Sequence, residues 1–163
     1  MPSTKQPITA ITTEASTLRI ARLKRDGSES AVLKSWLAQL EHSSDRQLFA
    51  KWFRLPQLSI WIAAPLADLE PRALAVGRST AEEYELYQLM TIDQYRRQGL
   101  ASVLLGQMFD DLRKDGVKQL FLEVRADNHA AIKLYRSMGF ELLQTRPAYY
   151  PDGADALNLG CDL

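Results

Sequence analysis

The sequence contains a single cysteine, Cys161, and only two histidines, His42 and His129. One cysteine excludes a disulfide within the chain, and it also excludes a zinc site built from clustered cysteines. The two histidines lie far apart and have no ligand spacing around them. We therefore expect no metal site and no metal-dependent chemistry.

Long apolar runs and surplus charge are also missing. No uninterrupted apolar stretch approaches the roughly 18 residues of a membrane-spanning helix, so we expect no membrane contact. Lys and Arg together number 20, as do Asp and Glu, and the formal net charge is zero. Because nucleic acid binding needs surplus cations, direct contact with nucleic acid is not expected either.

The first 17 residues lack the apolar core of a signal peptide. They are instead rich in Ser, Thr and Pro, which predicts a loose tail over 1–17 and a cytoplasmic protein. The whole chain has 163 residues, of which 46% are hydrophobic and 25% charged. This size and composition are typical of one globular domain, which we place over 18–163.

The spacing of apolar residues predicts the order of the elements. Strand-forming runs predict strands over 18–23, 58–64, 73–76, 83–91, 119–124, 141–146 and 157–161. Helical spacing predicts helices over 28–40, over 45–53, from Leu100 to Gly116 and between Asn128 and Gly139. Strands that alternate with helices in this way predict an α/β fold with strand–helix–strand units in a mixed sheet.

The strand over 83–91 has an alternating pattern. Its residues are expected to form two faces, with Tyr84, Leu86 and Gln88 on one and Glu85, Tyr87 and Leu89 on the other.

The segment Arg-Arg-Gln-Gly-Leu-Ala-Ser at 96–102 lies between a predicted strand and a predicted helix. A helix N-terminus offers unpaired backbone N–H groups and partial positive charge, which suit a pyrophosphate. Gly99 and Ala101 are small enough for a ligand to approach the backbone closely. The alternative is an ordinary turn with two solvated arginines.

Polar groups in the next strand and helix form a second candidate site. Glu123 interrupts a strand otherwise made of Leu, Phe and Val, so it is at an edge, paired or functional. Arg125 shares its face, and an ion pair between them is the structural alternative. Tyr135 lies on the apolar face of its helix, where the alternative is a core tyrosine with a bonded hydroxyl. Asn128 is placed to cap that helix.

Taken together, these segments resemble the GNAT superfamily of acetyl-CoA-dependent N-acetyltransferases. The loop is similar to its Arg/Gln-x-x-Gly-x-Gly/Ala pattern. Leu-Glu-Val-Arg-Ala-Asp-Asn at 122–128, Ala-Ile-x-Leu-Tyr at 131–135 and Met-Gly-Phe at 138–140 resemble the RimI-like subgroup of ribosomal-protein alanine N-acetyltransferases. So do Arg-Pro-Ala-Tyr-Tyr-Pro at 146–151 and the pair Asp155-Ala156. The resemblance covers residues 89–157.

The resemblance implies a fold and a set of roles. The GNAT fold has a twisted, mixed, mostly antiparallel sheet of about six or seven strands, with about four helices, splayed at the two central strands. Acetyl-CoA would be the donor, with Glu123 as general base, Tyr135 as general acid, and Tyr149 and Tyr150 walling the acceptor site. The implied acetyl-CoA-binding residues are Leu89, Met90, Thr91, Arg96, Arg97, Gln98, Gly99, Leu100, Ala101, Ser102 and Asn128.

The expected acceptor is the N-terminal α-amine of a protein, such as a ribosomal protein. An α-amine has a pKa of about 7.7–8.0 and a lysine of about 10.4, so one carboxylate suffices for the former near neutral pH. A small-molecule amine or a lysine is the alternative, which Glu82, Glu83 and Glu85 would suit if they line a cleft. A non-catalytic acyl-CoA-binding or ribosome-binding module is another, and the sequence leaves monomer and homodimer open.

Overall fold

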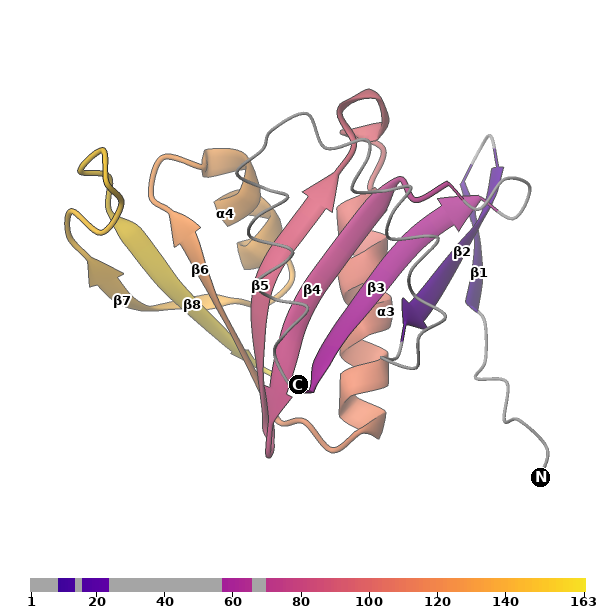
Figure 1. Ribbon diagram of the computed structural model, residues 1–163, viewed down its shortest axis with the longest axis horizontal. Coiled ribbons are helices and arrows are strands. Elements are labelled where there is room, and N and C mark those ends of the chain that lie inside the picture. Colours follow the sequence, from indigo (N-terminus) through magenta and orange to yellow (C-terminus); the bar gives the residue numbers. More distant parts are fainter. Residues whose placement is uncertain (1–8, 14–15, 24–56, 66–69) are drawn as a thin grey trace.

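The computed structural model describes residues 9–13, 16–23, 57–65 and 70–163. In this part of the chain, eight strands form one sheet in the order β1-β2-β3-β4-β5-β6-β8-β7 (Figure 1). Their bounds are β1 Thr9–Thr13, β2 Ser16–Leu23, β3 Leu58–Pro65, β4 Ala73–Thr80, β5 Glu83–Thr91, β6 Gln119–Arg125, β7 Glu141–Arg146 and β8 Ala156–Asp162. All neighbouring strands are antiparallel except β5 and β6, which are parallel.

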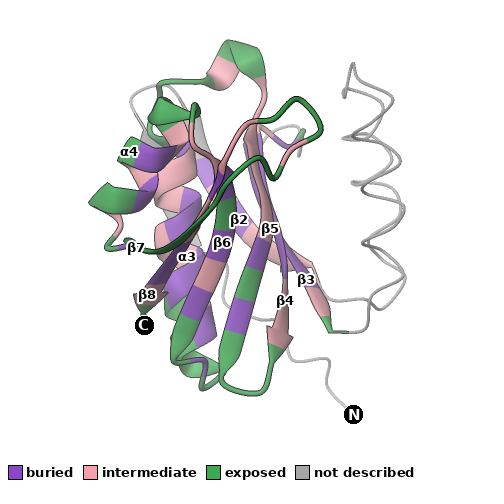
Figure 2. Cartoon of the chain, turned by 90° about the vertical axis from the view of Figure 1, so that its left-hand side faces the viewer, coloured by how far each residue is buried: buried purple, intermediate pink, exposed green. Residues whose placement is uncertain are grey.

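Two α-helices and one 3-10 helix complete the described part. The helices are η1 Asp93–Tyr95, α3 Leu100–Lys114 and α4 His129–Ser137. Both α-helices lie on the same face of the sheet, and their buried residues face it (Figure 2). None of the described helices is long and apolar enough to cross a membrane.

Sequence signals at the helix ends explain where α3 and α4 stop. Arg113 and Lys114 occupy the last turn of α3, where they complement the negative end of the helix dipole. Gly116 follows with φ +84° and Gly139 follows α4 with φ +92°, a left-handed conformation that favours glycine. The predicted ends of both helices are therefore confirmed.

The main core lies between the sheet and the two helices. Leu104, Leu105, Met108 and Leu112 of α3 are fully buried there, and each buried Leu or Met side chain contributes about 1.5–3 kcal/mol. Trp61 of β3 is also fully buried, and its Nε1 donates a hydrogen bond of 3.0 Å to Asp111 Oδ2 of α3. This bond fixes the long helix against the centre of the sheet.

The predicted mixed, mostly antiparallel sheet is confirmed, with one correction at its beginning. Thr9–Thr13 forms β1 and pairs with β2, although these residues belong to the segment expected to be a loose tail. The five residues raise the described strands to eight, above the expected six or seven. Thr and Ile are strand formers, and a neighbouring strand edge gives their backbone groups partners. The helices expected over 28–40 and 45–53 lie outside the described residues.

A β-bulge in β5 corrects the predicted faces of that strand. The cross-strand partner of Val76 is Gln88, whereas that of Gly77 is Leu86, so Tyr87 is an extra residue in β5. An extra residue reverses the alternation beyond it. Leu89 therefore packs into the helix-side core with Leu86, and Tyr87 packs on the opposite face.

The two central strands separate beyond the bulge. β5 and β6 are paired from Glu83–Gln119 to Leu86–Leu122, and no further pair follows. Beyond these positions the strands diverge, as Figure 1 shows. Because a bulge bends its strand, the position of Tyr87 accounts for where the separation begins. The predicted splay of the two central strands is confirmed.

Candidate active site

The loop between η1 and α3 has an unusual backbone. Arg97 has φ +59° and Gly99 has φ +78°, so two left-handed residues precede the helix. The side chain of Arg96 is held by residues that precede it in the chain. Its Nη2 lies 2.7 Å from Asp93 Oδ1, and its Nε donates a hydrogen bond to the carbonyl oxygen of Thr91. Arg97 is exposed and forms no ion pair or side-chain hydrogen bond with any other described residue. Of the two arginines, Arg97 is the one whose charge is available to a ligand.

The N-terminus of α3 presents free backbone donors. Gly99 is the N-cap and supplies no side-chain cap, and the first turn has no acidic residue. The first helical bond runs from Val103 N to Gly99 O, which leaves the N–H groups of residues 100–102 without helical acceptors. Leu100 is 3% exposed, so its side chain anchors the turn in the core. The arrangement fits an anionic group such as a pyrophosphate.

The end of β5 offers a second row of backbone groups. Leu89, Met90 and Thr91 pair with β4 on one side. On the other side they lie beyond the last residue that pairs with β6. Their edge toward β6 therefore has no strand partner among the described residues, and an extended ligand can align with it.

Glu123 is the first residue of β6 beyond the paired region. Its neighbours Leu122 and Val124 are buried in the helix-side core, so alternation places its carboxylate on the opposite face of the sheet. The side chain is 34% exposed, and Arg146 Nη1 of β7 lies 2.5 Å from its Oε1. This carboxylate is both accessible to solvent and held by a cation.

The alternative considered for Glu123, an ion pair with Arg125, is not formed in the structure. Arg125 instead bonds to Asp127 at 2.9 and 3.1 Å and to Asp152 at 2.9 and 3.2 Å. The guanidinium holds the pKa of both aspartates below the usual range. A planar guanidinium suits two carboxylates at once, and these come from loops that meet at the end of β6.

Tyr135 of α4 is 8% exposed and its ring lies 5.5 Å from that of Phe140, edge to face. Burial raises the pKa of this tyrosine to about 12, so the phenol stays protonated at neutral pH. Its hydroxyl forms no hydrogen bond with the other described residues. The alternative for Tyr135 was a core tyrosine whose hydroxyl is hydrogen-bonded. No such bond is formed within the part of the chain that the structure describes.

Asn128 caps α4, as its position in the sequence predicts. Its side-chain oxygen accepts a hydrogen bond of 3.2 Å from Ala131 N. The side-chain amide is not used by this bond, so the implied contact with the donor remains a prediction.

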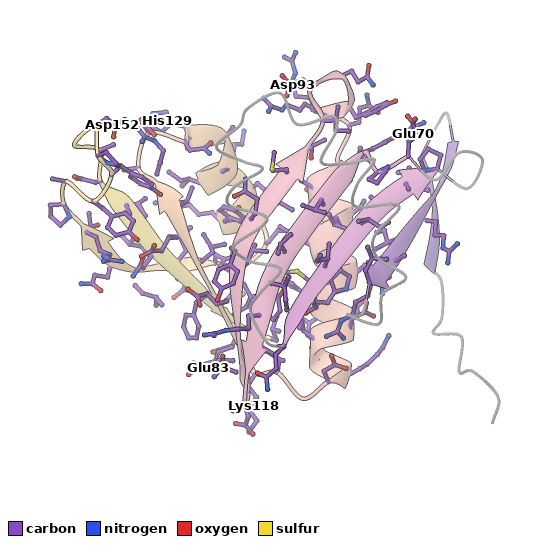
Figure 3. The ribbon with its side chains drawn as sticks, in the orientation of Figure 1. Glu70, Glu83, Asp93, Lys118, His129 and Asp152 are labelled. Carbon is purple, nitrogen blue, oxygen red and sulfur yellow. The ribbon has the colours of Figure 1, made fainter. Side chains whose placement is uncertain are left out.

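Tyr149 and Tyr150 lie in the loop between β7 and β8. Their rings are 5.2 Å apart and nearly perpendicular. Arg146 lies 4.0 Å from the centre of the Tyr149 ring, and Arg125 lies 4.7 Å from that of Tyr150. Asp152, in the same loop, lies at the top of Figure 3 on the same side as His129 of α4. We call the loop over 147–155 the tyrosine loop, and the bonds of Arg125 to Asp127 and Asp152 the Arg125 clamp. The clamp connects the tyrosine loop to the residues just before α4.

A groove of about 480 Å³ opens on the face of the sheet that carries Glu123. Its wall also includes Glu83 and Glu85 of β5, together with Arg78, Phe121 and Leu143. Glu82 is not part of it and pairs with Lys118 at 2.7 Å at the lower end of the sheet (Figure 3). Two of the three glutamates considered for a cationic acceptor thus share a groove with Glu123.

Arg146 is the residue whose contact the sequence did not predict. It stands three residues before Tyr149 in the Arg-x-x-Tyr-Tyr run, but its partner Glu123 lies 23 positions away on another strand. The Arg-x-x-Tyr-Tyr run was the sequence feature that could have indicated the contact of Arg146 with Tyr149, since an arginine and an aromatic residue close in sequence are able to stack.

Comparison with known proteins agrees with this geometry. The family model described as Acetyltransferase (GNAT) family matches residues 29–140. The ribosomal protein bS18-alanine N-acetyltransferase of Escherichia coli K12 is 44% identical over 79 residues, which cover 48% of this chain and 53% of that protein. The N-alpha-acetyltransferase RimI of Mycobacterium tuberculosis is 40% identical over 88 residues, or 53% of this chain and 54% of the relative. The matched segment thus spans about half the length of these relatives.

A solved structure covers more of the chain. The crystal structure of the ribosomal-protein-S18-alanine N-acetyltransferase from Escherichia coli superimposes with a TM-score of 0.73 and 28% identity, over 89% of this chain and 93% of that one. The fold, the splayed strands and a family match over more than half of the sequence agree. The chain belongs to the acetyltransferase (GNAT) family.

Proposed function

We propose that the protein transfers an acetyl group from acetyl-CoA directly to a primary amine, the N-terminal α-amine of a cytoplasmic protein such as a ribosomal protein. One observation supports this most strongly. β5 and β6 separate beyond Leu86 and Leu122, and the first side chain past that point on β6 is the carboxylate of Glu123. The opening thus joins a free strand edge for the donor to a base for the acceptor.

The donor is assigned to the α3 side of the opening. The N–H groups of residues 100–102 and the charge of Arg97 would hold the pyrophosphate, each charged hydrogen bond contributing about 1.5–3 kcal/mol. The free edge of Leu89, Met90 and Thr91 would align the pantetheine arm, and an N–H group there would polarise the thioester carbonyl.

Two side chains would handle the protons. As the amine nitrogen bonds to the acetyl carbon, Glu123 would take one proton from that nitrogen, directly or through a water. As the carbon–sulfur bond breaks, Tyr135 would give its phenolic proton to the leaving thiolate. Burial raises the pKa of Tyr135, which keeps the phenol protonated near neutral pH but also makes it a weaker acid.

The acceptor is assigned to the side of the tyrosine loop. An α-amine has a pKa of about 7.7–8.0, so a fraction is already neutral near pH 7 and one carboxylate is a sufficient base. The names of the two relatives above refer to alanine of protein bS18 and to N-alpha acetylation. These names, and the assignment of Glu123 as the one base, together favour a protein N-terminus.

A small cationic amine is a second candidate. Glu83 and Glu85 line the groove that contains Glu123, and their charges favour an acceptor with more than one ammonium group. A polyamine would place its reactive end at Glu123 and its other charges along β5.

An acceptor screen tests both candidates. The protein is incubated with acetyl-CoA and one of three acceptors, namely a peptide that begins with alanine, the same peptide already Nα-acetylated, or a polyamine. Thiol release and mass spectrometry report turnover. We expect acetylation of the free peptide only. Preferential acetylation of the polyamine would favour the second candidate, and binding of acetyl-CoA without turnover of any amine would indicate a non-catalytic module.

A further inference from the structure

The guanidinium of Arg146 lies between two residues of the candidate site. One nitrogen, Nη1, lies 2.5 Å from Glu123 Oε1, while the group as a whole lies 4.0 Å from the centre of the Tyr149 ring. Arg146 is in β7 and Glu123 in β6, and β8 separates these strands in the sheet. The contact therefore crosses the sheet face above β8 and joins the tyrosine loop to the proposed base.

A guanidinium in this position is a fixed positive charge. It stacks on an aromatic ring through its flat face and still donates hydrogen bonds from its edge. An arginine side chain is not deprotonated in proteins, so it does not exchange protons with Glu123. Hydrogen bonding to Glu123 raises the pKa of Arg146 further. Such a group orients a carboxylate and does not give it a proton or take one from it.

The carboxylate keeps one oxygen free. Arg146 bonds to Oε1, and Oε2 of Glu123 has no hydrogen bond to the other described residues. A proton taken from an acceptor amine would require an oxygen within about 2.6–3.2 Å of its nitrogen. Oε2 is the oxygen available for that contact. The hydrogen bond from Arg146 to Oε1 restricts rotation of the carboxylate.

We propose that Arg146 is a positioning residue, which turns the free oxygen of Glu123 toward the acceptor amine and is itself held in place by the ring of Tyr149. This proposal rests on the proposed function, in which Glu123 is the base. It also gives Tyr149 a task beyond walling the acceptor site, because the ring fixes Arg146 and Arg146 fixes the carboxylate.

The simpler alternative is a surface ion pair with no effect on turnover, and the chain contains a matched control for it. Arg113 on α3 pairs with Asp110 at 3.2 Å and lies 5.9 Å from the centre of the Phe109 ring. It has the same combination of carboxylate and aromatic ring, at the opposite end of α3 from the loop that contains Arg97. Arg113→Gln removes such a pair without touching the candidate site.

The first experiment compares Arg146→Gln, Arg146→Lys and Arg113→Gln in the acetylation of the alanine peptide. We expect Arg146→Gln to lower kcat by about 10- to 100-fold, a part of the roughly 10²–10⁴ that a positioned base contributes. Arg146→Lys keeps the charge but not the stacked fork, and it should recover part of the rate. Acetyl-CoA affinity should not change in either variant, and Arg113→Gln should behave as the parent. Unchanged kcat in Arg146→Gln overturns the proposal.

A double-mutant cycle with Glu123→Gln tests whether Arg146 acts through the carboxylate. If it does, Arg146→Gln should change kcat by less than about twofold once the carboxylate is gone, because the two effects are not additive. A full additional loss in that background overturns the proposal. The cycle also separates the two hypotheses, since normal turnover in Glu123→Gln alone would contradict the assigned base, whereas slow Glu123→Gln with normal Arg146→Gln contradicts only the role of Arg146.

A second variant covers the case in which Arg146→Gln does not fold. Tyr149→Leu removes the stacking ring while both charges remain. We expect it to lower kcat by a larger factor in the parent than in Glu123→Gln, because only the parent has a carboxylate for Arg146 to orient. A loss of the same size in both backgrounds contradicts the proposal.

Discussion

Leu86 and Leu122 are the last paired residues of β5 and β6, and the two strands separate immediately beyond them. Tyr87, the bulged residue of β5, and Glu123, the proposed base, follow them directly. The same position in the sheet therefore decides where the edge of β5 loses its pairing with β6 and where the carboxylate of Glu123 lies.

Arg97→Glu should weaken the binding of acetyl-CoA. The parent arginine has no partner among the described residues and stands next to the free N–H groups of α3, so reversal replaces attraction with repulsion. We expect the Kd to rise by about tenfold or more, in line with roughly 1.5–3 kcal/mol for a charged hydrogen bond. Isothermal titration calorimetry measures this, with Arg113→Glu at the other end of α3 as the control. Equal affinity in both variants would remove the phosphate assignment.

Gly99→Val should destabilise the start of α3 as well as the donor site. A Cβ at this position meets no atom within 4 Å, so no clash is involved. The φ of +78° is the obstacle, because a left-handed conformation costs a non-glycine residue about 1–2 kcal/mol, and more if it is β-branched. We expect a lower melting temperature and weaker acetyl-CoA binding. A variant with unchanged melting temperature would contradict the strain argument.

Tyr135→Phe should lower kcat by about 10²–10⁴-fold while the fold survives. Phe keeps the edge-to-face contact with Phe140, and the parent hydroxyl has no hydrogen bond to lose among the described residues. An aryl thioester, whose thiolate leaves without a proton, should restore much of the rate. Normal turnover of acetyl-CoA by a folded variant would exclude the acid role, and a slow variant that the activated donor does not rescue would indicate positioning instead.

Glu123→Gln should lower kcat and leave the affinity for acetyl-CoA intact. The amide keeps the shape of the carboxylate but does not accept the proton. The loss should diminish as the pH rises above the pKa of the acceptor amine, about 7.7–8.0 for an α-amine, because the substrate then arrives neutral. Rate measurements from pH 6 to about 9.5 test this. A loss that is constant across the range would contradict removal of a proton from the acceptor ammonium and would place the role of Glu123 in the transfer step itself.

The clamp formed by Arg125 should weaken in acid. The pKa values of Asp127 and Asp152 are lower in the folded protein than in the unfolded chain, so their contribution is present above about pH 4 and is lost as the pH falls through the lowered values. Hydrogen exchange of residues 147–155 should therefore accelerate below about pH 4. Arg125→Gln should exchange rapidly at neutral pH already and depend less on acid. Exchange in the parent that shows no pH effect beyond the intrinsic rate would contradict the clamp.

Local features of the sequence predicted most of the described elements. Apolar spacing located α3 and α4, and Gly116, Asn128 and Gly139 marked their ends, because helix ends depend on nearby residues. The loop at 96–102, to which we assign the donor, could also be located, since a helix N-terminus next to small residues and arginines is a local pattern. Resemblance then supplied the roles proposed for Glu123 and Tyr135, which no spacing alone would have indicated.

Contacts across the sheet were not predictable in the same way. Arg125 is two residues from Glu123 and shares its face, yet it bonds to Asp152, and Glu123 bonds to Arg146. Which arginine pairs with which carboxylate depends on the register of β6, β8 and β7 and on the course of the tyrosine loop. A sequence shows which residues are arginines and which are carboxylates, but it does not show which of them lie within hydrogen-bonding distance.

The sequence by itself determined the family, the order of the described strands and α-helices from β2 onward, and the residue types that the proposed chemistry requires. The tertiary structure decided that Thr9–Thr13 joins the sheet, that a bulge at Tyr87 reverses the faces of β5, and that Arg146 holds Glu123. The reason is physical. Helices form from contacts between residues three or four positions apart, but strand pairing, bulges and ion pairs between strands depend on residues that only folding brings together.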